Sequence, residues 1–157
     1  MEYVEIKSIR FKNRRHINWE DVAIYMKQFQ GDIVCVNETS DRIHINFDSV
    51  HEYSGSKYTM CLKGGLAKVK ANAVQIIPQL IQSATNKRWI ENKAEKHNNT
   101  AKRGWYRFDV YFMYPKSLPN GEIEKKPYRG TLVVKSNDRG LFFYDLVDIK
   151  KEAGNSR

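Results

Sequence analysis

The fold of this 157-residue chain is decided by residues 105–114, which read Trp105-Tyr106-Arg107-Phe108-Asp109-Val110-Tyr111-Phe112-Met113-Tyr114. Successive side chains of a β-strand point to opposite faces of the sheet. Every second residue from Tyr106 onward is aromatic or aliphatic, whereas the residues between them include Arg107 and Asp109. The alternation predicts a strand with one face in the core. We therefore expect Phe108 and Val110 to be buried and Arg107 to project away from the core, beside Trp105 and Asp109.

Two further strands are predicted after this one, at residues 131–136 and 141–149. Pro119-Asn120-Gly121 is a turn signal that separates the first strand from the second. Asn137-Asp138-Arg139-Gly140 joins the second strand to the third as a hairpin. Together the three segments predict an antiparallel meander.

The preceding residues are mainly helical in pattern. Asn18 is placed to cap a helix that runs to about Phe29, and residues 33–36 and 43–47 read as a β-hairpin. Residues 66–84 form a helical stretch in which Pro78 predicts a kink or two abutting helices. A further helix is expected at 87–97. The fold class is α+β, a single domain over 1–157, with a helix and hairpin in 1–56 and helices packed on an antiparallel sheet in 57–152.

Composition narrows the class of protein. Hydrophobic residues make up 41% and charged residues 29% of the chain, as in ordinary globular proteins. No stretch is long and apolar enough for a membrane span, and the first residues do not resemble a secretory signal. Two cysteines, Cys35 and Cys61, cannot build a disulfide framework. We expect a soluble, cytoplasmic protein without membrane contact and without a cofactor.

The net charge of +9 is concentrated in one third of the chain. Residues 57–107 hold eleven basic residues and only two acidic ones, and the remaining charges cancel. Such a localised positive field suits a polyanion such as RNA, although a solvated helical face is the simpler alternative. The residues expected to bind nucleic acid are cations and two aromatic side chains: Lys68, Lys70, Lys87, Arg88, Lys93, Lys102, Arg103, Trp105 and Tyr106.

Catalytic motifs are mostly absent. The sequence has no phosphate-binding glycine loop, no paired Cys or His spacing for a metal, and no serine nucleophile elbow. These absences disfavour metal-dependent nucleases, nucleotide triphosphatases and serine hydrolases. An enzyme that needs no metal is still compatible with the sequence.

Metal-free RNA cleavage requires a base for the 2′-hydroxyl, an acid for the leaving oxygen and cations for the phosphorane. His97 is the candidate base or acid, with Lys96, Arg103 and Arg107 on the phosphate. Two structural alternatives stand beside this hypothesis. His97 can cap the last carbonyls of a helix, and Arg107 can form a surface ion pair with Asp109 or Glu91.

Five blocks of the chain, at 13–19, 67–73, 91–97, 101–107 and 143–152, resemble a family from phages and integrative elements of Gram-positive bacteria. The most specific blocks are the Lys-His pair at 96–97 and Gly-Trp-Tyr-Arg at 104–107. The C-terminal half also resembles the barnase, EndoU, colicin and RelE nuclease superfamily. This resemblance implies one or two helices followed by a four-stranded antiparallel sheet, and RNA cleavage without a metal.

The resemblance adds Ser136 and Tyr144 to the candidate catalytic residues. Related sequences often carry His at position 136 and Arg at position 111, where this chain has Ser136 and Tyr111. A protein that has lost both groups would be a binding descendant of a nuclease. Tyr144 either donates a hydrogen bond to a phosphate or serves as a core aromatic residue.

Three functions remain open at this point. The first is a metal-independent, toxin-like ribonuclease of a mobile genetic element that leaves a 2′,3′-cyclic phosphate. The second is a catalytically inactive nucleic-acid-binding module with the same basic surface. The third is a protein-interaction or anti-defence factor of a mobile element, whose basic surface binds an acidic or RNA-loaded host complex. The expected partners are RNA or another nucleic acid and a host or immunity protein.

Overall fold

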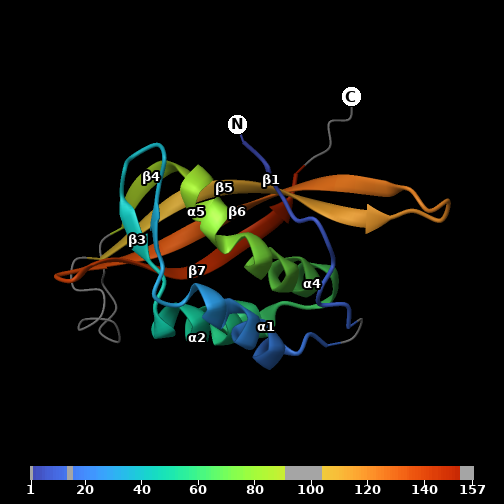
Figure 1. The fold of residues 1–157 in the computed structure, drawn as a ribbon, viewed down its shortest axis with the longest axis horizontal. Helices are drawn as coiled ribbons and strands as arrows, with labels where there is room; N and C mark the ends of the chain where they lie inside the picture. The colour runs from blue at the N-terminus through green and yellow to red at the C-terminus, as the bar shows by residue number, and fades with distance from the viewer. Residues whose placement is uncertain (1, 14–15, 91–103, 153–157) are drawn as a thin grey trace.

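The computed structural model describes residues 2–13, 16–90 and 104–152, which form an α+β fold (Figure 1). The helices are α1 Trp19–Met26, α2 Phe47–Gly55, α3 Lys57–Cys61, α4 Gly64–Ala73 and α5 Ile77–Ser83, with 3-10 turns at Lys27–Phe29 and Val74–Ile76. The strands are β1 Val4–Glu5, β2 Ile33–Cys35, β3 Arg42–His44, β4 Thr85–Ile90, β5 Gly104–Ser117, β6 Ile123–Asn137 and β7 Gly140–Lys151. None of the helices in these residues has the length and apolarity needed to cross a membrane.

All seven strands join one sheet in the order β1-β5-β6-β7-β3-β2, and β4 pairs with β5 beside β1. The predicted meander of β5, β6 and β7 is confirmed as antiparallel. The expectation of a wholly antiparallel sheet is wrong, because β1 runs parallel to β5 and β3 runs parallel to β7. Both β1 and β3 belong to the N-terminal region, and helices lie between each of them and its parallel partner in the chain. Parallel pairing requires a long connection of this kind.

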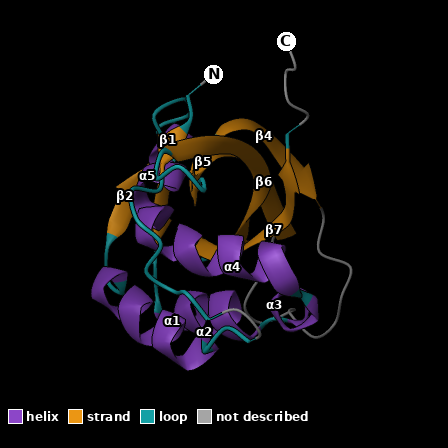
Figure 2. Cartoon of the chain, turned by 90° about the vertical axis from the view of Figure 1, so that its right-hand side faces the viewer, coloured by secondary structure: helices purple, strands orange, loops and turns teal. Residues whose placement is uncertain are grey.

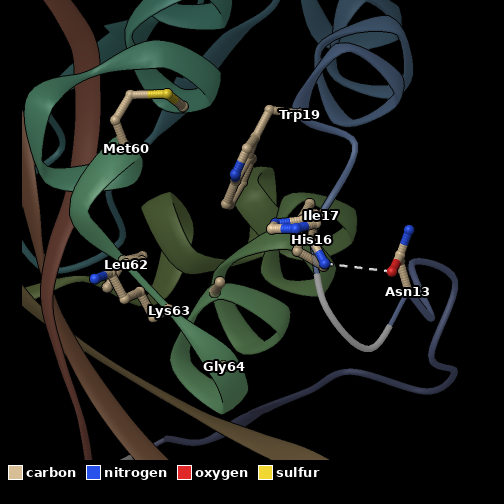
Figure 3. A pocket seen from close by; sticks show the side chains of 9 residues that line it. Asn13, His16, Ile17, Trp19, Met60, Leu62, Lys63 and Gly64 are labelled. Atoms are coloured by element: carbon tan, nitrogen blue, oxygen red, sulfur yellow. Dashed lines mark hydrogen bonds between the residues drawn. The ribbon is translucent and has the colours of Figure 1, made fainter.

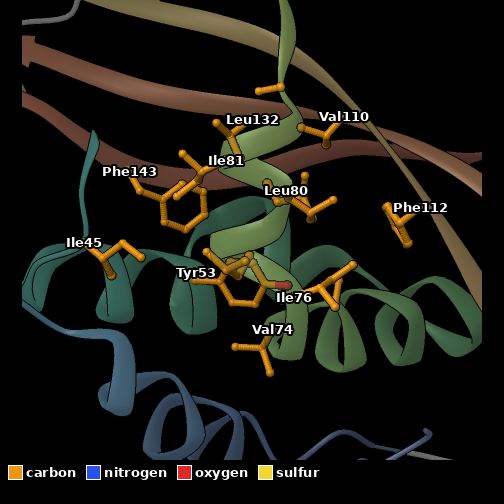
Figure 4. Close-up of a cluster of buried hydrophobic side chains, with 14 of the residues drawn as sticks. Ile45, Tyr53, Val74, Ile76, Leu80, Ile81, Val110, Phe112, Leu132 and Phe143 are labelled. Atoms are coloured by element: carbon orange, nitrogen blue, oxygen red, sulfur yellow. The ribbon is translucent and has the colours of Figure 1, made fainter. Parts of the chain in front are cut away.

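The sheet curls around α5 (Figure 2). Phe108, Val110 and Phe112 of β5 are completely buried, which confirms the predicted register of this strand. Leu80 and Ile81 of α5 lie among the side chains that β5, β6 and β7 present to the core (Figure 4). The main core therefore lies on the concave side of the sheet.

Several local predictions are confirmed. The side chain of Asn18 accepts hydrogen bonds from the amides of Glu20 and Asp21 and so caps α1. The hairpin of β2 and β3 forms as expected. Pro78 lies in the first turn of α5, which abuts α4 through a short 3-10 turn. Proline fits this position because the first amides of a helix have no intrahelical partner.

The prediction of a helix at 87–97 is wrong for residues 87–90, because residues 85–90 form β4. Antiparallel pairing with β5 sets Trp89 opposite Tyr106, with ring centroids 4.7 Å apart. This contact with a distant strand outweighs local helix propensity. Residues 91–97 lie outside the described part of the chain.

The helices α2 and α3 were not predicted. Phe47, expected at the end of a strand, is instead the first residue of α2. Asn46 and Ser49 form a reciprocal capping box, each side chain accepting a hydrogen bond from the other residue's amide. Such a box satisfies two of the amides that a helix start leaves unpaired.

Lys70 of α4 is completely buried, which corrects the expectation that it binds nucleic acid. Its ammonium lies 2.5 Å from a carboxylate oxygen of Asp145 in β7 and also donates to the hydroxyl of Thr59. Ser56 donates to the second carboxylate oxygen of Asp145. A buried charge is tolerated only when it is paired and hydrogen-bonded, and Asp145 supplies that partner from 75 residues away.

We predict that Lys70→Met lowers the free energy of unfolding by about 3 kcal/mol or more, because it leaves Asp145 buried without its cation. Adding Asp145→Leu should recover part of that loss in urea unfolding. The exposed pair Lys125–Glu5, 2.9 Å apart, supplies the control. Lys125→Met should cost under about 1 kcal/mol, and equal losses in Lys70→Met and Lys125→Met would contradict the prediction.

Candidate functional site

The side of the sheet that faces away from α5 is called the outer face here. On β5 it carries the residues that alternate with the buried ones, namely Trp105, Arg107, Asp109 and Tyr111. Arg107 is partly exposed while Phe108 is completely buried, so the predicted direction of Arg107 is confirmed. The antiparallel register places Lys135, Val133, Thr131 and Arg129 of β6 opposite these four residues.

A pocket of about 230 Å³ opens on the outer face and spans four strands. We call it the sheet pocket, and it is lined by Arg88, Asp109, Arg129, Gly130, Thr131, Asp148 and Lys150. Arg107 adjoins it, because its guanidinium lies 3.8 Å from the carboxylate of Asp148. The site therefore brings four cations together with two carboxylates in a volume suited to a small oxyanion.

A β-bulge in β7 shapes the sheet pocket. Thr131 pairs with Val147 and Arg129 pairs with Lys150, so β7 contains one residue more than β6 between these pairs. Asp148 in this bulge has φ 50°, a left-handed conformation that aspartate tolerates. A Cβ on Gly130 would lie 3.0 Å from Leu146, so glycine lets β6 approach β7 here. Bulges redirect side chains in this way near functional sites.

Two of the cations are held in place by neighbours. Arg88 lies 3.1 Å from Asp109 and donates to the carbonyl oxygen of Asn86 at 2.7 Å. The side-chain amide of Asn86 in turn donates to the carboxylate of Asp109 at 2.9 Å. Arg107 is paired with Asp148 and not with the Asp109 of the surface-pair alternative; Glu91, the other residue of that alternative, lies outside the described residues.

The other cationic groups keep unused donors. Within residues 2–13, 16–90 and 104–152, the side chains of Arg129 and Lys150 make no hydrogen bond or ion pair, and both are exposed. The Nε of Arg107 is buried and has no hydrogen-bond partner among the described residues. A buried donor left without an acceptor is costly. An oxyanion in the sheet pocket would supply an acceptor to Arg129 and Lys150, which both line it.

Aromatic side chains flank the sheet pocket along β5. Tyr111 contacts Tyr3 edge-on, with ring centroids 5.6 Å apart. At the other end, Trp105 contacts Tyr144 edge-on at 4.7 Å, and the ammonium of Lys135 lies 5.1 Å from the Tyr144 ring. Burial and a hydrogen bond to Glu52 raise the pKa of Tyr144 well above its usual value, so this hydroxyl stays protonated near neutral pH.

The structure brings together four of the predicted site residues, Arg88, Trp105, Arg107 and Tyr144, on the outer face. It does not bring Ser136 to them. Ser136 follows Lys135 in β6, so its side chain points to the other side of the sheet, where the residue is only 6% exposed. Ser136 therefore cannot act on a phosphate held by Arg107.

The remaining predicted residues lie elsewhere. The ammonium of Lys87 lies 2.8 Å from the carboxylate of Asp41 and 4.2 Å from the ring centroid of Tyr106. Tyr106 lies between Trp105 and Arg107 in β5, so its side chain does not belong to the outer face. Lys68 lies in α4 and is partly buried. Five predicted residues fall outside the described part of the chain: Lys93, Lys96, His97, Lys102 and Arg103.

Sequence reasoning missed Arg129, Lys150, Thr131 and Asp148. The sequence contained only part of the information needed to find them. The alternation of β5 predicts a polar outer face, but it does not identify the residues of β6 and β7 that lie beside β5 on that face. Which residues lie there depends on the register of the strands and on the bulge in β7, and no local sequence pattern predicts that bulge.

No model of a known protein family matches this chain, and no curated protein matches it significantly. The described residues also contain no group of three or more His, Cys, Asp or Glu side chains arranged to hold a metal ion.

We predict that orthophosphate stabilises the protein by binding in the sheet pocket. At ten times its dissociation constant, phosphate should raise the free energy of unfolding by about 1.4 kcal/mol and the Tm by about 3 °C. Differential scanning fluorimetry against chloride at equal ionic strength measures this shift. Arg129→Gln should reduce it, whereas Arg139→Gln, in the exposed β6–β7 turn, should not; identical shifts in the two variants would refute a phosphate site here.

Proposed function

We propose that this protein binds single-stranded nucleic acid, with RNA as the expected ligand, through the outer face of β4, β5, β6 and β7. The observation that carries the proposal is the sheet pocket with the unused donors of Arg129 and Lys150, next to the partly exposed Arg107. Phosphate contacts of this kind supply most of the affinity in nucleic-acid binding. The concentration of basic residues in the sequence supports the same conclusion.

The aromatic residues beside the sheet pocket suit a single strand. Trp105 and Tyr111 are six residues apart on β5, which corresponds to about 20 Å along the strand. Unpaired bases stack on aromatic side chains regardless of sequence, while cations between them contact the phosphates. In the proposed complex, a phosphate occupies the sheet pocket and adjacent bases lie toward Tyr111 and toward Trp105.

We expect the affinity for single-stranded RNA to fall with salt, with a log–log slope near −0.7 per phosphate neutralised. Arg129→Gln and Lys150→Gln should each weaken binding and reduce the slope by about 0.7, because each removes one phosphate contact. Asp148→Asn should strengthen binding, because it removes a carboxylate and keeps a residue that tolerates φ 50°. Fluorescence anisotropy over a range of salt concentrations measures all three.

Arg139→Gln is the control for this experiment, since it removes an equal charge at the exposed β6–β7 turn. If the affinity for RNA does not depend on salt, or if Arg129→Gln and Arg139→Gln lower it equally, the proposal that the outer face binds RNA is wrong.

Metal-independent RNA cleavage is a second candidate function, suggested by the resemblance of the C-terminal half to the barnase-like nuclease superfamily. The feature in common with that superfamily is the antiparallel meander of β5, β6 and β7. The observation that favours it is that Arg107 and Tyr144 share the outer face close to the start of β5. A phosphate held by Arg107 would need a nearby base or acid. His97, expected in that role with Lys96 and Arg103, lies outside the described residues, and Ser136 has no part in this proposal because of its position.

Cleavage is tested by incubating the protein with RNA in EDTA and analysing the products for 2′,3′-cyclic ends. We expect His97→Ala to abolish cleavage, because it removes the only proposed group that titrates near neutral pH. His51→Ala, at an exposed position of α2, should retain it. If wild type and His97→Ala leave the RNA equally intact, the binding function stands alone. A host or immunity protein as a partner stays a prediction, tested by nuclease-resistant capture of one defined protein.

A further inference from the structure

A second pocket lies far from the sheet pocket in the chain, between the segment that leads into α1 and the junction of α3 with α4 (Figure 3). We call it the helical pocket. Its volume is about 400 Å³, and it is lined by Asn13, His16, Ile17, Trp19, Met60, Leu62, Lys63, Gly64 and Ala67. Pockets of this size hold small organic ligands.

The wall of the helical pocket is mainly apolar. Ile17, Leu62 and Ala67 line it together with Trp19. The indole of Trp19 projects from the start of α1 toward the hollow (Figure 3). Met60 also lines it and is 54% exposed, although methionine is usually buried. An indole face and a flexible thioether form an adaptable surface for a flat aromatic ring.

The polar lining of the helical pocket includes one lysine and two ring N–H groups, besides the side chain of Asn13. Within the part of the chain that the structure describes, the Lys63 ammonium, the His16 ring and the Trp19 indole nitrogen make no hydrogen bond or ion pair. The backbone amide of His16 donates to the side chain of Asn13 at 3.3 Å, which shapes the rim. None of the nine lining residues carries a carboxylate. The described lining thus offers a cation and N–H donors to an anion, with no carboxylate to repel it.

One class of ligand combines both requirements, a flat ring for the apolar wall and a negative group for the donors. We infer that the helical pocket binds a nucleotide, with its base against Trp19 and Met60 and its phosphate toward Lys63 and His16. The pocket shares no residue with the sheet pocket, so this inference is independent of the proposed function. The same chemistry is offered by a free nucleoside monophosphate and by the phosphorylated end of a nucleic-acid strand.

Isothermal titration calorimetry with AMP, adenosine and orthophosphate as separate probes tests the inference. In Arg129→Gln, in which the sheet pocket is impaired, AMP should bind with one-to-one stoichiometry, and more tightly than adenosine or orthophosphate alone. Lys63→Gln should weaken AMP binding at least fivefold without changing the affinity for adenosine. Lys63 is exposed, so this substitution does not disturb the core. Lys57→Gln, an equivalent change at an exposed residue of α3 outside the pocket, should leave AMP binding unchanged.

Quenching of Trp19 fluorescence by AMP, in a Trp89→Phe/Trp105→Phe background, reports where the ligand lies. Absence of AMP binding, equal binding by Lys63→Gln and Lys57→Gln, or loss of AMP binding in Arg129→Gln would each overturn the inference; the last result would place the ligand in the sheet pocket. If Lys63→Gln weakens the binding of a 5′-phosphorylated oligonucleotide but not that of the same oligonucleotide without the phosphate, the ligand is a strand end. An effect limited to AMP identifies the free nucleotide.

Discussion

The buried ion pair between Lys70 and Asp145 holds the helices to the sheet, and much of the remaining structure depends on it. The pair belongs to a closed network in which Thr59 and Ser56 of the α3 region satisfy the two charged groups, and Tyr53 of α2 donates to the Lys70 carbonyl oxygen at 2.5 Å. Burial lowers the pKa of Lys70 and raises that of Asp145, and the contact between them opposes both shifts. Since each charge would be very unfavourable alone, the network admits only one relative position of α2, α3, α4 and β7.

The same network fixes the irregular course of β7. Val134 pairs with Phe143 and Val133 pairs with Asp145, so Tyr144 is the extra residue of a bulge directly before the buried carboxylate. Tyr144 contacts Trp105 of the outer face, while Asp145 is held toward α4. Where β3 no longer covers β7, helices do so: Ser49 donates to the carbonyl oxygen of Phe143, and the Tyr58 hydroxyl accepts from the amide of Ile149. Side chains thereby satisfy an edge that would otherwise invite another strand.

The candidate site was predictable as a face but not as a pocket. Alternation along β5 correctly placed Arg107 and Phe108 on opposite faces of the sheet, because successive side chains of a strand point to opposite sides. The count of basic residues assigned Lys70 to the same basic surface, since charge counting does not distinguish a solvated lysine from one buried against a distant aspartate. Arg129, Lys150 and Asp148 approach Arg107 only through the register of β6 and β7, and Ser136 is excluded by that same register.

The sequence by itself determined the features that depend on neighbours in the chain. These are the cap at Asn18, the helix break at Pro78, the turns that separate β5, β6 and β7, and the buried face of β5. Only the tertiary structure decided that residues 85–90 pair with β5 instead of forming a helix, that β1 and β3 join the sheet in parallel, and that Lys70 lies in the core. The physical reason is the same in each case. Local periodicity fixes which way a side chain points, whereas pairing partners and burial depend on groups that lie tens of residues away and meet only when the chain is folded.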